Sequence, residues 1–517
     1  AGKETTTTLT AFGAFAGQDH VDGYDNTFIG RASGREVTNG HSNTTLGFNS
    51  LLTATTAVTN TALGKNAMRL TTTGSDNVAV GHEALDKNTT GGNNTAVGKS
   101  ALIANTTASF NTAVGDKAMQ TNTTGTNNTA IGHQALNKNT TGGLNTGLGL
   151  NALYNNTTGT VNTAVGHSAL KANNTGGYNV AIGHESMLAN TTGITNTALG
   201  NNALRGNTTA SQNVGIGTNA LYTNTTGSDN VAVGHNALDA NTTGTLNTAV
   251  GKDALGANTT ASSNTAVGRE AMRDNTTGTN NISMGVSALS TNTTASSNTA
   301  LGTAALRRNT TGPSNTAVGH QAMDSNTTGF ENVASGYRAL YNNTSGETNT
   351  AIGTEALRDN QTADNNTAVG KSALMSNTTG ELNTAVGRGA LDASTTAEYN
   401  VAVGKDAGST LTTGSYNAVL GTFALRDATT AARSVAIGTS ALQNCVTGTQ
   451  NTAVGSNCLT STTGNNNTAI GYASGNANTS GSQNTFVGRD SGKNVTTGTN
   501  NTVLGDNTSA SSATVSN

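Results

Sequence analysis

Six histidines combine a reactive side chain with a regular spacing. Each follows directly after a glycine: His82, His133, His167, His184, His235 and His320. Imidazole binds metal ions and transfers protons near neutral pH, so this slot could carry chemistry. His167 and His184 are seventeen residues apart and should stack, but no third ligand type accompanies them. We therefore expect no metal site and no catalytic histidine.

Charged residues gather in two dipeptide slots, one after the glycine and one after a leucine or methionine, as in Lys252-Asp253 and Arg273-Asp274. Glycosidases use two carboxylates about 5–9 Å apart, and such pairs arise by chance on a charged surface. Catalysis also needs a cleft in which unlike groups converge, and no unit carries an insertion that could build one. We expect two solvated faces of mixed charge, no enzyme and no cofactor.

The sulfur-containing residues are expected to be structural. Cys445 replaces a corner asparagine and Cys458 replaces an alanine in the next unit, four slots away. This offset does not favour a disulfide, so free thiols are expected. Five of the seven methionines occupy a leucine slot, which indicates packing: Met68, Met119, Met187, Met272 and Met323.

A short repeat must position all of these residues. Residues 94–102 and 366–374 both read NTAVGKSAL, sixteen times seventeen residues apart. The glycine of this stretch recurs every seventeen residues from Gly30 to Gly455 and, after one step of sixteen, continues to Gly505. A fixed short period over the whole chain is the signature of a repeat architecture.

Seventeen residues are too few for a helical repeat, which needs about 33. Asn-Thr corners and glycine turns suit one coil of a solenoid with two short strands, in which like residues stack about 4.8 Å apart. The predicted fold class is all-β: a parallel β-solenoid (β-roll) of about 30 coils, continuous over residues 9–509. One such stack would be a rod roughly 140 Å long. Polar tails at residues 1–8 and 510–517 are expected to be flexible.

Two columns of large apolar residues indicate the coil interior. The residue before the glycine is aliphatic or Met except at Ser335, and the residue four after it is Leu or Met between residues 51 and 459 except at Gly408. Successive strand residues face opposite sides, so Ala96 should point outward if Val97 points inward. A small outward column favours a parallel neighbouring chain packed against it. The alanines of this predicted interface are Ala96, Ala113, Ala130, Ala164, Ala181 and Ala198.

Corners and ends carry further signals. Stacked asparagines such as Asn241 can form amide ladders. The same NTT triplets are N-glycosylation sequons, but glycans every ~4.8 Å would not fit, which favours the ladder. Near the ends, Gly34 and Gly492 replace the leucine while Phe28 and Phe486 enter the alanine column. This exchange predicts end-specific packing.

Several stretches resemble known repeats. SVAIG at residues 434–438, NVAIG at 179–183 and NVAVG at 77–81 resemble the repeat of trimeric autotransporter adhesin heads. TGTNNTAIGHQAL at residues 124–136 resembles the repeats of phage and bacterial tail-fibre-domain proteins. The resemblance covers about residues 9–509 and implies left-handed β-rolls, three chains side by side, used for attachment. The period of seventeen departs from the shorter adhesin repeat, so handedness and the trimer rest on analogy.

These observations favour an extracellular structural or adhesive fibre subunit, on a virion or a cell surface, that meets a glycan or protein receptor. The net charge of −3 argues against nucleic acid, and no apolar run approaches the ~20 residues that span a bilayer. An ice-binding solenoid is the alternative, because threonine is plentiful. However, Thr242 and Thr243 are adjacent, whereas a flat array needs alternation. A polysaccharide-degrading tailspike is the weaker alternative.

Overall fold

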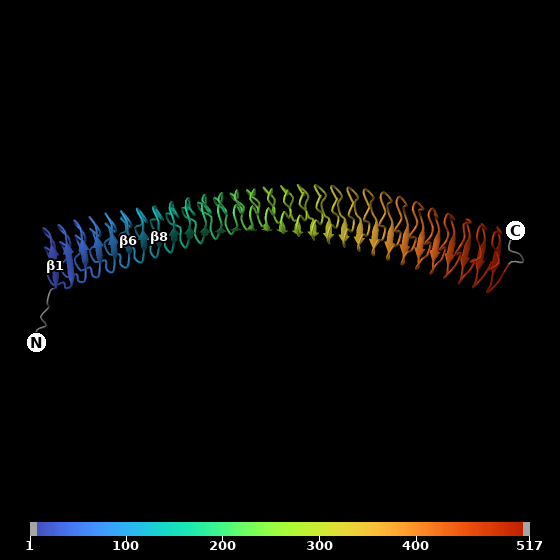
Figure 1. The fold of residues 1–517 in the computed structure, drawn as a ribbon, viewed down its shortest axis with the longest axis horizontal. Coiled ribbons are helices and arrows are strands. Elements are labelled where there is room, and N and C mark those ends of the chain that lie inside the picture. The colour runs from blue at the N-terminus through green and yellow to red at the C-terminus, as the bar shows by residue number, and fades with distance from the viewer. Residues whose placement is uncertain (1–7, 510–517) are drawn as a thin grey trace, which may run out of the picture. The chain divides into compact units, whose positions relative to one another are not determined.

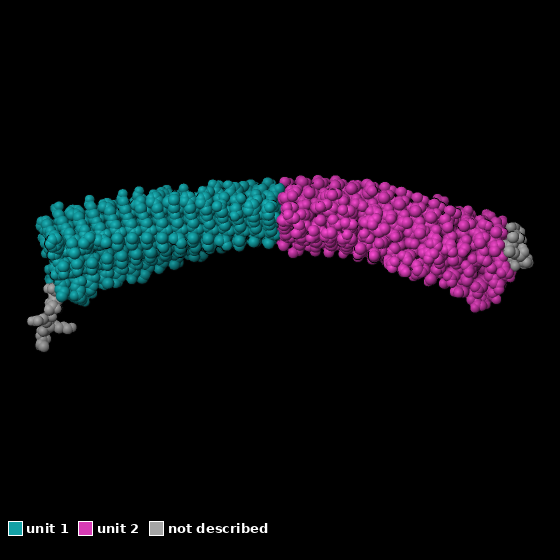
Figure 2. All heavy atoms as spheres, viewed as in Figure 1, with its two compact units in different colours: residues 1–261 teal, residues 262–517 magenta. Residues whose placement is uncertain are grey.

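The computed structural model describes residues 8–509, which form thirty β-strands and no helix. Each strand belongs to one coil of a parallel β-solenoid, and Figure 1 shows one short arrow per coil. The chain divides into two compact units, residues 1–261 and residues 262–517, which are coloured separately in Figure 2. The expected flexibility of residues 1–7 and 510–517 concerns residues outside the described part.

Unit 1 holds the first fifteen strands. They are β1 (Leu9–Phe12), β2 (Asn26–Ile29), β3 (Thr44–Leu46), β4 (Thr61–Leu63), β5 (Val78–Val80), β6 (Thr95–Val97), β7 (Thr112–Val114), β8 (Thr129–Ile131), β9 (Thr146–Leu148), β10 (Thr163–Val165), β11 (Val180–Ile182), β12 (Thr197–Leu199), β13 (Val214–Ile216), β14 (Val231–Val233) and β15 (Thr248–Val250). Neighbouring strands pair in parallel at the seventeen-residue register, for example Ala164 with Ala181.

Unit 2 repeats this arrangement. Its strands are β16 (Thr265–Val267), β17 (Ile282–Met284), β18 (Thr299–Leu301), β19 (Thr316–Val318), β20 (Val333–Ser335), β21 (Thr350–Ile352), β22 (Thr367–Val369), β23 (Thr384–Val386), β24 (Val401–Val403), β25 (Ala418–Leu420), β26 (Val435–Ile437), β27 (Thr452–Val454), β28 (Thr468–Ile470), β29 (Thr485–Val487) and β30 (Thr502–Leu504). The coil of sixteen residues keeps the pairing, because Thr452 aligns with Thr468. The predicted solenoid and its period are therefore confirmed.

The expectation of two strands per coil was wrong, because each coil has one. In the coil of β6, Ser100, Leu102 and Phe110 have φ of 55°, 51° and 62°, so the chain turns instead of extending. A left-handed residue costs roughly 1–2 kcal/mol. The turned segment is nevertheless tied to its neighbours, since Leu102 N donates to Ala118 O at 3.0 Å and Ser100 N donates to His82 O at 2.9 Å.

The interior is lined by Ala96, Leu102 and their equivalents, which are 0% exposed in almost every coil. The Leu102 column was therefore predicted correctly. The assignment of the two strand columns was wrong: Ala96 points inward, while Val97 is partly exposed on the outer face of the strand. The predicted interface along Ala96, Ala113, Ala130, Ala164, Ala181 and Ala198 is thus excluded by their burial inside their own coils.

Steric fit explains this inversion. At Gly215, which occupies the alanine column, an added Cβ would lie 3.2 Å from Leu204 Cγ and 3.3 Å from Ala220 O. A coil this narrow accommodates leucine from one wall only if the facing wall carries alanine. Positive φ in the leucine column disfavours Val and Ile, because β-branched residues adopt that conformation at a cost.

Two amide ladders complete the interior. In the first, Asn111 N and Nδ2 donate to Asn94 Oδ1 at 3.0 and 3.3 Å, and Nδ2 also donates to Gly125 O at 3.0 Å. In the second, Asn241 Nδ2 donates to Asn224 Oδ1 at 2.8 Å and to Gly244 O at 3.0 Å. These asparagines are fully buried, so the ladder prediction is confirmed. Buried amides with partners stabilise the coil, whereas unpaired ones would cost free energy.

Near the ends, phenylalanine in the alanine column and glycine in the leucine column fit together for the same steric reason. An added Cβ at Gly34 would lie 2.6 Å from the Phe28 ring, and one at Gly492 would lie 2.2 Å from the Phe486 ring. Both rings are fully buried and fill the space that leucine fills elsewhere. Gly408 is compensated in a similar way, since Val419 occupies the alanine column of the next coil. The predicted end-specific packing is confirmed.

Candidate functional site

The outer face of the strands is the most regular surface of both units. The Val column, defined as Val97 and its equivalents, and the Thr column, defined as Thr95 and its equivalents, alternate with the buried alanines. The Thr column holds Thr, Val or Ile except at Ala418, and neither column contains a charged residue. Leu199 and Leu420 of the Val column are 46% and 50% exposed. The result is an uncharged, largely apolar stripe two side chains wide in each unit.

The hydroxyl groups on this face are free of protein partners. Within residues 8–509, Thr95 Oγ1 and its equivalents donate to no other protein atom. A different threonine column behaves in the opposite way, because Thr106 Oγ1 donates to Thr123 O at 3.1 Å and this bond recurs along the stack. The hydroxyls of the Thr column therefore face outward, whereas those of the Thr106 column link the corners of neighbouring coils.

The histidine slot is exposed, as expected. The His167 and His184 rings stack with their centroids 5.1 Å apart and an interplanar angle of 11°, which confirms the predicted pair. Across residues 8–509, no three His, Cys, Asp or Glu side chains group closely enough to hold a metal ion. The six histidines are thus spread along the stack and not brought together in one centre.

The two charged slots carry both signs, but the second is less solvated than expected. Lys252 Nζ lies 3.6 Å from Asp253, and both side chains reach solvent. In the slot after the Leu102 column, Arg307 Nε lies 2.9 Å from Asp324 Oδ1, and the Asp324 side chain is 0% exposed. Burial of this carboxylate beside a guanidinium marks a structural ion pair.

The cysteines and the asparagines of the NTT triplets are buried. Cys445 and Cys458 are free thiols, as predicted, and burial raises the pKa of Cys445 to about 11 and that of Cys458 to about 12. Both thiols stay protonated at neutral pH and are poor nucleophiles. The sequon asparagine Asn241 is 0% exposed, so its amide serves the ladder and is inaccessible in the folded chain.

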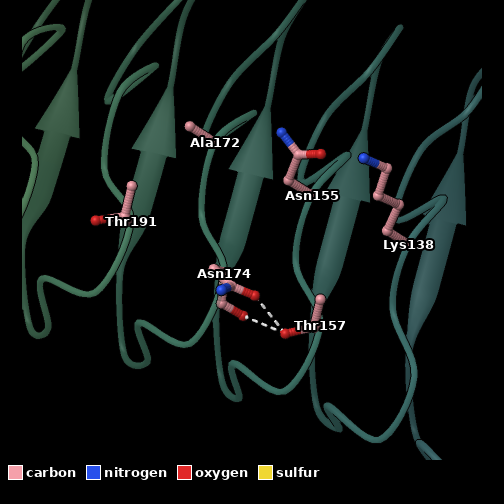
Figure 3. Close-up of a pocket in the computed structure, with 6 residues that line it drawn as sticks. All are labelled: Lys138, Asn155, Thr157, Ala172, Asn174 and Thr191. Atoms are coloured by element: carbon pink, nitrogen blue, oxygen red, sulfur yellow. Dashed lines mark hydrogen bonds between the residues drawn. The ribbon is translucent and has the colours of Figure 1, made fainter.

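A shallow polar pocket of about 370 Å³ opens on the turned side of the coils in unit 1 (Figure 3). Six residues line it: Lys138, Asn155, Thr157, Ala172, Asn174 and Thr191. They come from two columns of the repeat, one on each side of the second amide ladder. The lining contains a cation, amides and hydroxyls but no carboxylate, so it lacks the pair of acids that glycoside hydrolysis requires.

Sequence reasoning missed both the outward stripe and this pocket. One signal of the stripe was present in the sequence: Phe28 enters the alanine column where Gly34 replaces the leucine. A ring that compensates for a missing interior leucine must itself lie inside the coil, so the alanine column is interior and the Val column faces outward. No family model matches the chain, and no curated protein matches it in sequence. Among the described residues, no helix is long and apolar enough to cross a membrane.

Proposed function

We propose that this chain is a structural or adhesive extracellular fibre subunit whose copies pack in parallel through the Val and Thr columns. The observation that carries the proposal is the uncharged, largely apolar stripe along the strands of each unit. Monomeric proteins rarely expose contiguous apolar patches beyond a few hundred Å². Fifteen strands about 4.8 Å apart extend the stripe of one unit over roughly 70 Å. A stripe of that length marks an interaction surface.

Parallel association suits the geometry of this face. Side chains of the Val column recur at every coil, so two or three aligned stripes can interdigitate without leaving voids. Each buried aliphatic side chain contributes up to about 1.5–3 kcal/mol, and many small contributions add along the stripe. Three chains is the number implied by the resemblance to adhesin heads. Placement on a virion or a cell surface, and a noncatalytic role, belong to the same proposal.

The native mass of the intact chain tests the association. We expect an oligomer at micromolar concentration that dissociates when Val165→Arg and Ile182→Arg are combined, because two guanidinium groups would enter the apolar contact. The control His167→Arg lies on the exposed turned side and should leave the mass unchanged. A single-chain mass for the folded wild-type protein would contradict the proposed packing.

Ice binding is the second candidate, and one observation favours it. Thr242 and Thr243 are adjacent and cannot form a flat array. The strand face does carry such an array, because the free hydroxyls of the Thr column lie beside the aliphatic side chains of the Val column. Regular methyl and hydroxyl groups can order water at their own spacing. A freezing-hysteresis measurement on the intact chain checks this, and the absence of both hysteresis and ice shaping would eliminate the candidate.

A further inference from the structure

The overall charge of −3 conceals a strongly basic segment in unit 1. Residues 87–171 contain five lysines and one acidic residue, Asp116, so the segment has a formal net charge of +4 (five minus one). The lysines are Lys87, Lys99, Lys117, Lys138 and Lys171. All five occupy the turned side of the coils, away from the strand face, so packing through the Val column would leave them accessible.

Two lysines elsewhere in the chain are paired with a carboxylate, whereas within residues 8–509 these five are not. Lys252 and Lys405 lie 3.6 and 3.7 Å from the following aspartate. In the described part of the chain, none of the five lysines of residues 87–171 lies within ion-pair distance of a carboxylate. Their positive charge is therefore available to an external anion.

The pocket of Figure 3 lies within this basic surface. Lys138, Asn155 and Ala172 line one side, and the small Ala172 side chain leaves open space there. On the other side, Asn174 occupies a column that usually holds threonine. Thr157 Oγ1 donates to the backbone oxygen and the side-chain oxygen of Asn174. Lys138 Nζ lies 5.2 Å from the ring centroid of half-buried Tyr154.

The donors of this pocket are the Lys138 ammonium and the side-chain amides of Asn155 and Asn174. None of these three groups donates to another protein atom in the described part. An ammonium group beside amides matches a carboxylate flanked by hydroxyl groups, which is the chemistry of a uronic acid. A volume of about 370 Å³ is at the small end of ligand pockets and suits a sugar residue.

We propose that this pocket and the surrounding lysines bind an acidic polysaccharide, with one uronate carboxylate at Lys138. Lys171 lies two coils further along the stack, a spacing of about 10 Å, in the column next to that of Lys138, and meets the next charged sugars of the same chain. A polymer is favoured over a free sugar because the unpaired lysines continue along the coils. Nucleic acid is disfavoured because the pocket lining offers no aromatic platform on which bases would stack. The inference rests on the proposed adhesive role and specifies its receptor class.

Titration of the intact chain with a fluorescent oligogalacturonate tests the site, with dextran of equal length and duplex DNA as comparison probes. Lys138→Gln combined with Lys171→Gln should weaken binding of oligogalacturonate about tenfold, the loss expected for a hydrogen bond to a charged group. The matched control combines Lys252→Gln with Lys405→Gln. It removes the same total charge from paired lysines, and binding should change less than twofold.

Tighter binding of oligogalacturonate than of dextran or DNA, lost only in the pocket variant, supports the site. Equal binding of dextran, tighter binding of DNA, equal weakening in the control variant or no binding at all would overturn it. Native mass is measured on the same samples. A monomer that still binds oligogalacturonate contradicts the proposed assembly but not the site, and an oligomer that binds none contradicts only the site.

Discussion

Asp239 illustrates the electrostatic cost of a polar residue beside the coil interior. Partial burial raises the pKa of its carboxyl, and the nearby Asp253 carboxylate adds to the rise. A raised folded pKa means that the folded state binds more protons than the unfolded state in this range. Stability therefore falls as pH rises from about 4 through the folded pKa, and the loss persists at neutral pH.

Asp239→Asn removes this ionisation, so we expect a gain in unfolding free energy at pH 7 of up to about 1 kcal/mol. The gain should vanish near pH 3, where the carboxyl is protonated in both states. Thermal or urea unfolding at the two pH values measures the difference. Asp229→Asn, at an exposed turn, is the matched control and should show little change. A gain that is independent of pH would contradict the argument.

For single residues, prediction from the sequence was right for one interior column and wrong for the other. Leu102 was placed inside correctly because its column holds leucine or methionine in nearly every coil, which indicates a buried position. Ala96 and Val97 were exchanged because alternation shows that they face opposite sides without showing which side is the interior. Burial of the larger residue was the natural assumption, and it fails where the coil is too narrow for two large side chains.

At the scale of the coil, glycines such as Gly98 combine a positive φ with a close contact to the next coil. Gly98 has φ of +136°, and an added Cβ would lie 2.4 Å from Gly115 O. Gly98→Ala should therefore lower the unfolding free energy by more than about 1 kcal/mol, because the backbone cannot adopt this conformation with alanine and the neighbouring coil must move. Thermal unfolding followed by circular dichroism measures the loss.

Gly125→Ala provides the control within the same fold. An added Cβ at Gly125 would lie 2.3 Å from Gly142 O, about as close as at Gly98, but φ at Gly125 is not positive and its column already contains alanine at Ala108 and Ala210. We expect a much smaller change than for Gly98→Ala. Comparable losses of unfolding free energy in the two variants would mean that close contact with the next coil, and not a positive φ, requires glycine at these positions.

The period predicted the coil, its length and its corners, but not its single strand. Seventeen residues with two glycines suggested two extended segments. The second segment is turned because Ser100 and Leu102 adopt left-handed conformations. Propensity disfavours these conformations, but hydrogen bonds to adjacent coils and burial of Leu102 stabilise them. The pocket was equally inaccessible to prediction. It lies where the small Ala172, in a column of variable residues, is next to Asn174, which replaces the usual threonine.

At the scale of the molecule, each coil depends mainly on its immediate neighbours, as in other repeat proteins. Ala164 is fully buried inside its coil, so Ala164→Arg would bury an unpaired guanidinium or force the coil open. We expect limited proteolysis to cut near residue 164 while most β-structure persists by circular dichroism. A single global loss of structure would instead show that the coils unfold together.

Thr158→Arg, at an exposed corner of the preceding coil, is the control and should leave the cleavage pattern unchanged. The result also separates the two assignments of the alanine column. If Ala164→Arg remained protease-resistant and changed only the native mass, the alanine would have to face outward, contrary to its burial.

The sixteen-residue coil has a consequence for how such a chain changes over generations. Its first-ladder bonds persist, since Asn467 Nδ2 donates to Asn451 Oδ1 at 3.1 Å across sixteen residues. The shortening falls at the corner between exposed Thr463 and buried Gly464. Recombination between misaligned copies can therefore add or delete whole coils while every amide finds an equivalent partner. Fibre length in such a lineage can drift in units of one coil, and crossovers that break the frame of the ladder are eliminated.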